Sequence, residues 1–178
     1  CGLDPLGVLA TDDVDALLAL RPDCVVYTPK WQSVDELVRI LEAGINVVST
    51  AAFITGDNLG PDRQRIVDAC ARGGSSMFGT GISPGFVELI AITLAGVCDR
   101  VDKVTVAEAA DTTFYDSPET ERPAGFARPI DDPALPEMAR QGTAVFGEAV
   151  ALVADALGVD LDEIVCETEF AQTTEDLV

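Results

Sequence analysis

A run of small and turn-forming residues, Gly79 to Phe86, carries the clearest chemical signal in this chain of 178 residues. The apolar residues before the run predict a strand, and the apolar residues after it predict a helix that begins near Val87. A turn of this kind lies at the positive end of a helix dipole and leaves backbone N–H groups free for a carboxylate, a phosphate or a polarised ring substituent. We therefore expect this run to form part of a ligand site.

The elements that must position this run are three predicted strands separated by helices. The strands cover residues 23–29, 46–50 and 76–78 and read as buried, and amphipathic helix patterns lie between and around them. Such an alternation predicts a parallel sheet with right-handed crossover connections. Ligands bind these sheets beyond the carboxyl ends of the strands.

Polar or turn-forming residues follow all three predicted strands, which is the pattern of a binding crevice. Taken singly, each of these groups is also ordinary turn chemistry. The groups are Thr28 and Pro29, Ser49 and Thr50, and Gly79 to Ser83.

The pattern changes after the helix that follows the third strand. Residues 103–111 and 163–170 alternate and predict strands, with a Pro-rich loop and a helix over about 136–157 between them. We therefore predict two domains: 1–100 is the C-terminal part of a nucleotide-binding domain, and 101–178 begins an α+β domain. The predicted fold class is α/β, a partial Rossmann-like sheet. Its first βαβ unit is expected to be missing, because no Gly-x-Gly-x-x-Gly run precedes the first strand.

Composition narrows the possible partners. A net charge of −20 argues against nucleic acid and against anionic membrane surfaces. The chain has no histidine and no close cysteine pair, so we expect no metal site. No signal peptide or membrane span is visible, and five cysteines without a paired motif are typical of a cytoplasmic protein. The half-apolar strand predicted at 163–170 favours a homodimer.

Three short runs, in this order, resemble the dihydrodipicolinate reductase superfamily: Val25 to Pro29, Asn46 to Thr50 and Gly79 to Phe86. The chain is most similar to the branch of 2,4-diaminopentanoate dehydrogenase and related amine dehydrogenases, and the block from Phe146 to Gly158 fits that branch too. This resemblance implies a Rossmann domain for NAD or NADP, a second domain with an open mixed sheet, and a small-molecule substrate between them. It assigns Thr28, Pro29, Ser49, Thr50, Gly81 and Ser83 to the cofactor, and Pro84, Gly85, Phe86 and Ala110 to the substrate.

The departures from the superfamily change the expected chemistry. The two histidines and the lysine of dihydrodipicolinate reductases fall here on Ala110, Asp111 and Phe114. Alanine cannot donate a proton and phenylalanine cannot pair with a substrate carboxylate. Dihydrodipicolinate is therefore disfavoured as the substrate. The amine dehydrogenase branch carries an acid just after the second strand, where this chain has Ala51 and Ala52.

Another residue must then move the proton, and we favour Asp111 together with Tyr115. The plainer interpretations are that Asp111 binds a turn at a strand end and that Tyr115 packs its ring. Glu88 and Glu108 are the other candidates, and Glu88 is more simply a partner of the helix dipole.

These residues are compatible with two functions. The first is an NAD(P)-dependent oxidoreductase that acts on a C=N or C=O bond of a small amine, imine or ketone. The second is a non-catalytic, nucleotide-binding or dimerising member of the same fold. The missing acid favours the second function, and the intact polar strand ends favour the first.

Overall fold

A small parallel sheet is the centre of the structure, a computed structural model that describes residues 7, 12–50, 54–112 and 114–172. Its strands are β1 (Cys24–Tyr27), β2 (Asn46–Ser49) and β3 (Met77–Gly79), in the order β1-β2-β3. Both pairings are parallel, so the predicted α/β class and the parallel sheet are confirmed.

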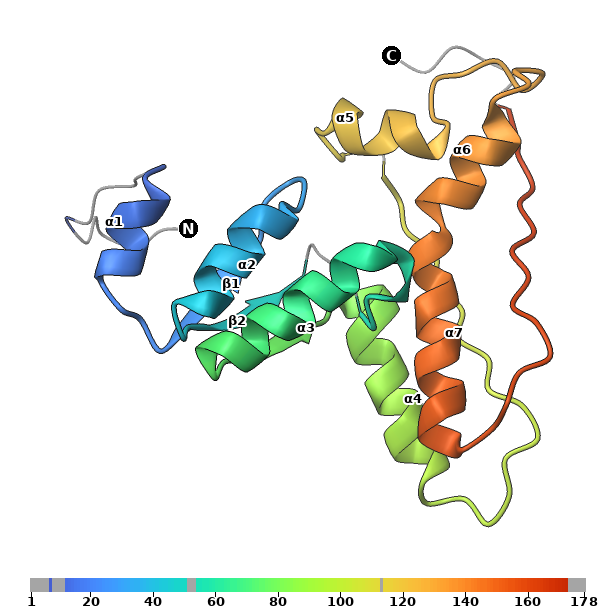
Figure 1. Cartoon of the computed structure of the whole chain (residues 1–178). Coiled ribbons are helices and arrows are strands. Elements are labelled where there is room, and N and C mark those ends of the chain that lie inside the picture. Colours follow the sequence, from blue (N-terminus) through green and yellow to red (C-terminus); the bar gives the residue numbers. More distant parts are fainter. Residues whose placement is uncertain (1–6, 8–11, 51–53, 113, 173–178) are drawn as a thin grey trace.

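The helices divide between one face of the sheet and a separate helical layer (Figure 1). Helices α2 and α3 cover one face of the sheet. Helices α4 and α7 pack against each other in the helical layer. The helix predicted at 136–157 is interrupted at Thr143 and forms two helices. The bounds are α1 (Val14–Ala19), α2 (Val34–Glu42), η1 (Asp57–Leu59), α3 (Pro61–Gly73), η2 (Ile82–Phe86), α4 (Val87–Ala95), α5 (Pro118–Glu121), η3 (Arg122–Ala124), α6 (Leu135–Gly142) and α7 (Ala144–Leu157).

The two faces of the sheet differ. Leu37 and Leu41 of α2 are fully buried and belong to one core with Val47 of β2. On the other face Val26, Val48 and Phe78 form one cross-strand row. Val26 is 72% exposed and Phe78 is 52% exposed. The strands were predicted to be buried, and this row shows that the described residues cover the second face only in part.

Helices α2 and α3 approach each other closely at their C-terminal ends. A Cβ atom added to Gly73 would lie 1.8 Å from the carbonyl oxygen of Leu41. The same carbonyl accepts a hydrogen bond from the buried hydroxyl of Ser75 at 2.8 Å. An ion pair between Arg72 and Glu42, at 2.6 Å, lies on the surface of this contact. Gly73 is therefore a packing requirement, and Gly74, with φ of 63°, ends α3.

The start of α2 is tied to the end of β1 by Tyr27. Ser33 caps the helix, since its hydroxyl accepts from the N–H of Glu36 at 3.4 Å. In a full capping box the Glu36 carboxylate would accept from the Ser33 N–H. Here it accepts instead from the Tyr27 hydroxyl, at 2.9 Å. That hydroxyl in turn accepts from the Ser33 N–H at 2.9 Å. Burial, followed by the hydrogen bond to Glu36, raises the pKa of Tyr27 above its usual value of 10.0, although the bond from Ser33 opposes the shift.

We expect Tyr27→Phe to lower the free energy of unfolding by about 1 kcal/mol near neutral pH, because one hydrogen-bonded hydroxyl is lost. The folded-state pKa is raised, so neutral Tyr27 stabilises the fold below pH ~10, and this contribution disappears as the pH rises through the folded-state value. Urea unfolding at neutral and alkaline pH should therefore show a smaller alkaline loss in Tyr27→Phe than in the wild type. The control is Tyr115→Phe, which removes the exposed hydroxyl of the only other tyrosine. An equal alkaline loss in all three proteins would contradict the assignment.

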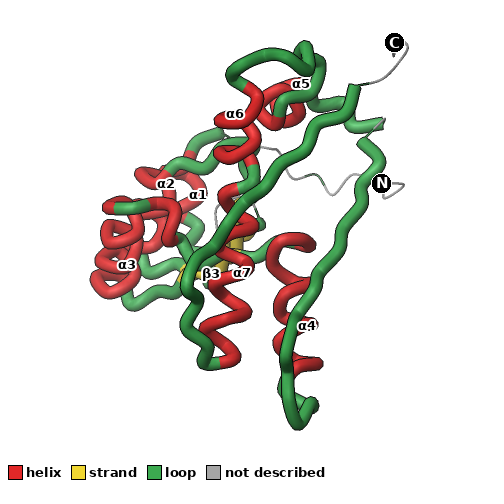
Figure 2. Tube along the Cα trace, turned by 90° about the vertical axis from the view of Figure 1, so that its right-hand side faces the viewer, coloured by secondary structure: helices red, strands yellow, loops and turns green. Residues whose placement is uncertain are grey.

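Two long segments, residues 99–112 and 159–172, run extended beside the helical layer (Figure 2). The predictions of strands at 103–111 and 163–170 are wrong for this structure. A strand requires a hydrogen-bonded neighbour, and these segments pair with no strand among the described residues. The second segment contacts the helices through side chains, as between Cys166 Sγ and Thr143 Oγ1 at 2.9 Å.

None of the helices in the described ranges combines the length and the apolar character needed to cross a membrane.

Candidate active-site edge

The parallel register brings the residues that follow the strands to one edge of the sheet. Tyr27 is level with Ser49, and Ser49 is level with Gly79. Beyond these positions Thr80 continues the alignment, because its N–H donates to the Ser49 carbonyl at 2.8 Å. The polar ends predicted from the sequence therefore share one edge.

The hydroxyl groups at this edge are not equivalent. Ser49 is completely buried, and its hydroxyl donates to the Tyr27 carbonyl at 2.8 Å, so it joins β1 to β2. The side chains of Thr28 and Thr50 are exposed, and Pro29 is half-buried. The exposed hydroxyl groups next to the ends of β1 and β2 are therefore those of Thr28 and Thr50.

The turn at Gly79–Phe86 differs in one respect from the expectation of free N–H groups. The N–H of Gly85 donates to the carboxylate of Glu88, and the N–H of Phe86 donates to the Gly81 carbonyl at 2.9 Å. Glu88 is 4% exposed and lies in the first turn of α4. A carboxylate does bind at this turn, but the protein supplies it, and Glu88 is the dipole partner.

A hollow of about 120 Å³ lies at the end of β3, between the turn and the helical layer. Gly85 lines it, with φ of 136°, a backbone conformation that favours glycine. Phe86 is 56% exposed and lines a second depression, along α4. Ser83 and Pro84 are half-buried in the turn. The hollow is mostly apolar and is lined by Ile54, Met77, Phe78, Gly79, Thr80, Gly85, Leu89 and Leu152.

The predicted proton-transfer residues lie on the segment between α4 and α5. Ala110, Asp111 and Tyr115 are exposed, and Tyr115 is held in a turn by its N–H, which donates to the Thr112 carbonyl at 2.8 Å. Residues 51–53, where the amine dehydrogenase branch would place its acid, lie outside the described residues.

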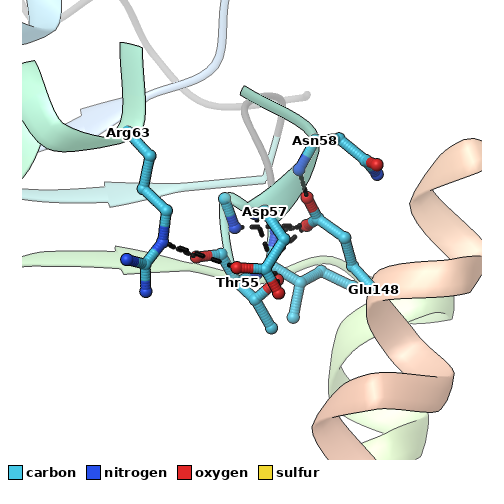
Figure 3. A network of polar contacts seen from close by, with 7 residues as sticks. Thr55, Asp57, Asn58, Arg63 and Glu148 are labelled. Carbon is cyan, nitrogen blue, oxygen red and sulfur yellow. Dashed lines mark hydrogen bonds and ion pairs between the residues drawn. The ribbon is translucent and has the colours of Figure 1, made fainter. Parts of the chain in front are cut away.

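Glu148 of α7 is a functional candidate that the sequence pattern alone did not reveal. Its side chain is 3% exposed, and its carboxylate accepts four backbone N–H groups of the segment after β2 (Figure 3). Oε2 accepts from Ile54 at 2.9 Å, from Thr55 at 3.1 Å and from Gly56 at 3.4 Å. Oε1 accepts from Asn58 at 2.9 Å. The sequence signals were a single acid in the apolar first turns of the helix and its place in the block from Phe146 to Gly158, which resembles the amine dehydrogenase branch.

Neighbouring contacts brace the same segment, which we call the 54–58 loop. The Asn58 side chain donates to the Ala144 carbonyl at 3.0 Å, so the loop also reaches the first residue of α7. Arg63 donates to the Thr55 carbonyl at 3.2 Å and pairs with Asp57 at 3.6 Å (Figure 3). These contacts hold a loop from the sheet against a helix that lies about ninety residues later in the sequence.

The residues at the edge fit a nicotinamide nucleotide in their chemistry. The strand ends offer two exposed hydroxyl groups, and Gly79 contributes no side chain beside the hollow. Close backbone approach together with hydrogen-bonding groups suits a flat ring with a polar amide.

Comparison with known proteins gives two curated relatives. The chain is 34% identical over 169 residues to an amine dehydrogenase of Streptomyces virginiae, an alignment that covers 89% of this chain and 47% of that protein. It is 27% identical over 131 residues to the 2,4-diaminopentanoate dehydrogenase of Acetoanaerobium sticklandii, covering 70% of this chain and 36% of that protein. The chain thus spans about half the length of the curated relatives it matches, or less. No family model and no solved structure matches it.

Proposed function

From the membership of this chain in the amine and 2,4-diaminopentanoate dehydrogenase branch, we propose that it is part of an NAD(P)-dependent oxidoreductase for a small amine, imine or ketone. The observation that carries the proposal is the edge where three parallel strands end, with an apolar hollow at the end of β3. Ligands of parallel α/β sheets bind at such an edge. The names of the two relatives supply the substrate class.

The reaction proposed is oxidative deamination and its reverse. An alkyl ammonium ion, NAD(P)⁺ and water give a ketone or aldehyde, NH₄⁺, NAD(P)H and one proton. The nicotinamide accepts the hydride when bound. In this proposal Thr28, Thr50 and the turn from Gly81 to Ser83 hold the cofactor, and the hollow beside Gly85 holds the alkyl group.

Proton transfer requires a separate group, and we assign it to Asp111 with Tyr115. Both side chains are exposed, so neither is committed to the core. We further propose that residues 1–100 belong to the cofactor domain, that residues 101–178 begin the substrate domain, and that the protein is a homodimer. The exposed side chains of Val26 and Phe78, on either side of half-buried Val48, support the presence of further covering structure.

The test is turnover by the full-length protein with a panel of small alkyl amines and NAD⁺ or NADP⁺, followed by the absorbance of the reduced cofactor. We expect amine-dependent reduction, and ammonia-dependent oxidation of NAD(P)H with the matching ketones. Quenching of Trp31, the only tryptophan, by NADPH measures binding separately from turnover. Absence of both turnover and quenching would contradict the proposal.

The second candidate is a non-catalytic, nucleotide-binding member of the branch. The sequence departure that favours it is the pair Ala51 and Ala52 in place of the acid. Quenching of Trp31 without turnover of any amine or ketone would support this alternative.

A further inference from the structure

Glu148 is a buried anion with no cationic side chain bonded to it in the described part of the chain. A buried charge is costly unless hydrogen bonds replace its hydration. Four N–H groups of one loop supply those bonds, and bonds to an ionised acceptor are among the strong ones in proteins. The loop and the carboxylate therefore depend on each other.

The loop held in this way forms part of the hollow. Ile54, whose N–H is 2.9 Å from Glu148 Oε2, is one of the residues that line it. Leu152 lies four residues after Glu148 on the same side of α7, and it lines the hollow too. One face of α7 therefore provides both a wall of the hollow and the anchor for another wall.

We propose that Glu148 is a positioning residue: it fixes the 54–58 loop so that Ile54 closes an apolar subsite for the alkyl group of the substrate. This inference rests on the proposed function for the identity of the ligand. Both carboxylate oxygens are engaged by backbone donors, so the role is to hold the loop and not to transfer a proton. The apolar lining selects an uncharged alkyl group over a second carboxylate or ammonium group.

The first arm of the test measures the anchor without turnover. In Glu148→Gln the amide has one acceptor oxygen and directs its N–H₂ group at a backbone donor. Amide hydrogen exchange at Ile54, Thr55 and Asn58 should become at least about tenfold faster, while exchange in α2 and α3 stays unchanged. The matched control is Glu137→Gln, which changes an exposed glutamate of α6. Unchanged exchange at the loop would overturn the proposal.

The second arm separates positioning from general stability. In full-length Glu148→Gln the KM for the alkyl amine should rise about tenfold, with kcat and NADPH quenching of Trp31 nearly unchanged. Faster exchange with an unchanged KM would overturn the positioning role. If the wild type turned over no amine, the proposed function would be contradicted instead. The hydrogen-exchange measurement would then test only whether Glu148 holds the loop.

A milder variant covers the case in which Glu148→Gln does not fold. Asn58→Ala removes only the side-chain bond to the Ala144 carbonyl and keeps its N–H bond to Glu148. Its loop exchange and its KM should change in the same direction by a smaller factor. Exchange and KM both equal to those of the wild type would count against the loop as a wall of the subsite.

Discussion

Full-length Asp111→Asn should turn over its amine substrate at least ~100-fold more slowly than the wild type, the low end for removing a general acid or base. Hydride transfer to or from the carbon requires a proton to leave or reach the nitrogen. In our proposal a carboxylate beside a phenol can hold and pass that proton. Tyr115→Phe should therefore cause a loss of similar size, and the double variant should lose little more, because the two residues act as a unit.

The control for this prediction is Asp102→Asn, an exposed aspartate on the same extended segment that pairs with Arg100 at 2.6 Å. It should retain full activity. Asp111 and Tyr115 are exposed, so we expect the unfolding midpoints of the variants to differ little. Measuring the midpoints beside the rates separates a loss of rate from unfolding. If Asp111→Asn had the kinetics of the wild type, proton transfer would be assigned to Glu108 instead.

Gly73→Ala should destabilise the protein by about 3 kcal/mol or more, although alanine is the better helix former. The added methyl group would lie 1.8 Å from the Leu41 carbonyl oxygen and 2.9 Å from its carbon. Both are backbone atoms of α2, so no side-chain rotation relieves the clash and the two helices must separate. Separation would also stretch the buried bond from Ser75 to the same oxygen.

The neighbouring glycine is the matched control. A Cβ on Gly74 would meet no atom within 4 Å, and only the left-handed φ of 63° opposes it. Gly74→Ala should therefore cost about 1–2 kcal/mol. Urea unfolding of the two variants side by side measures the difference. Equal stability of both would mean that α2 and α3 do not approach as closely as described.

The sheet and its order of connections could be predicted because they depend on local patterns. Apolar runs marked the three strands, and amphipathic patterns marked the helices between them. The failures concern long-range partners. The alternation at 103–111 was the right local signal for a strand, but strand formation requires a neighbour that these residues do not have in the described chain.

The candidate site, too, could be predicted only where it depends on local patterns. Strand ends gather at an edge for topological reasons, so Thr28 and Thr50 could be placed from the sequence. The use of Ser49 inside the sheet and of Glu88 inside the turn could not be foreseen, because both depend on which backbone groups lie within reach after folding. Glu148 was missed for the same reason, since its partners lie about ninety residues earlier.

The anchor formed by Glu148 has a consequence for how this protein can diverge. Its donors are main-chain groups that every residue except proline provides. Substitutions at Ile54, Thr55 and Asp57 therefore keep these four bonds, provided that none introduces proline at a donor position. Gly56, with φ of 81°, and Asn58, whose side chain donates to the Ala144 carbonyl, are more constrained. The carboxylate has no such freedom, because a single side chain serves all four donors. Among natural variants we expect a loop of drifting sequence opposite a glutamate that does not change.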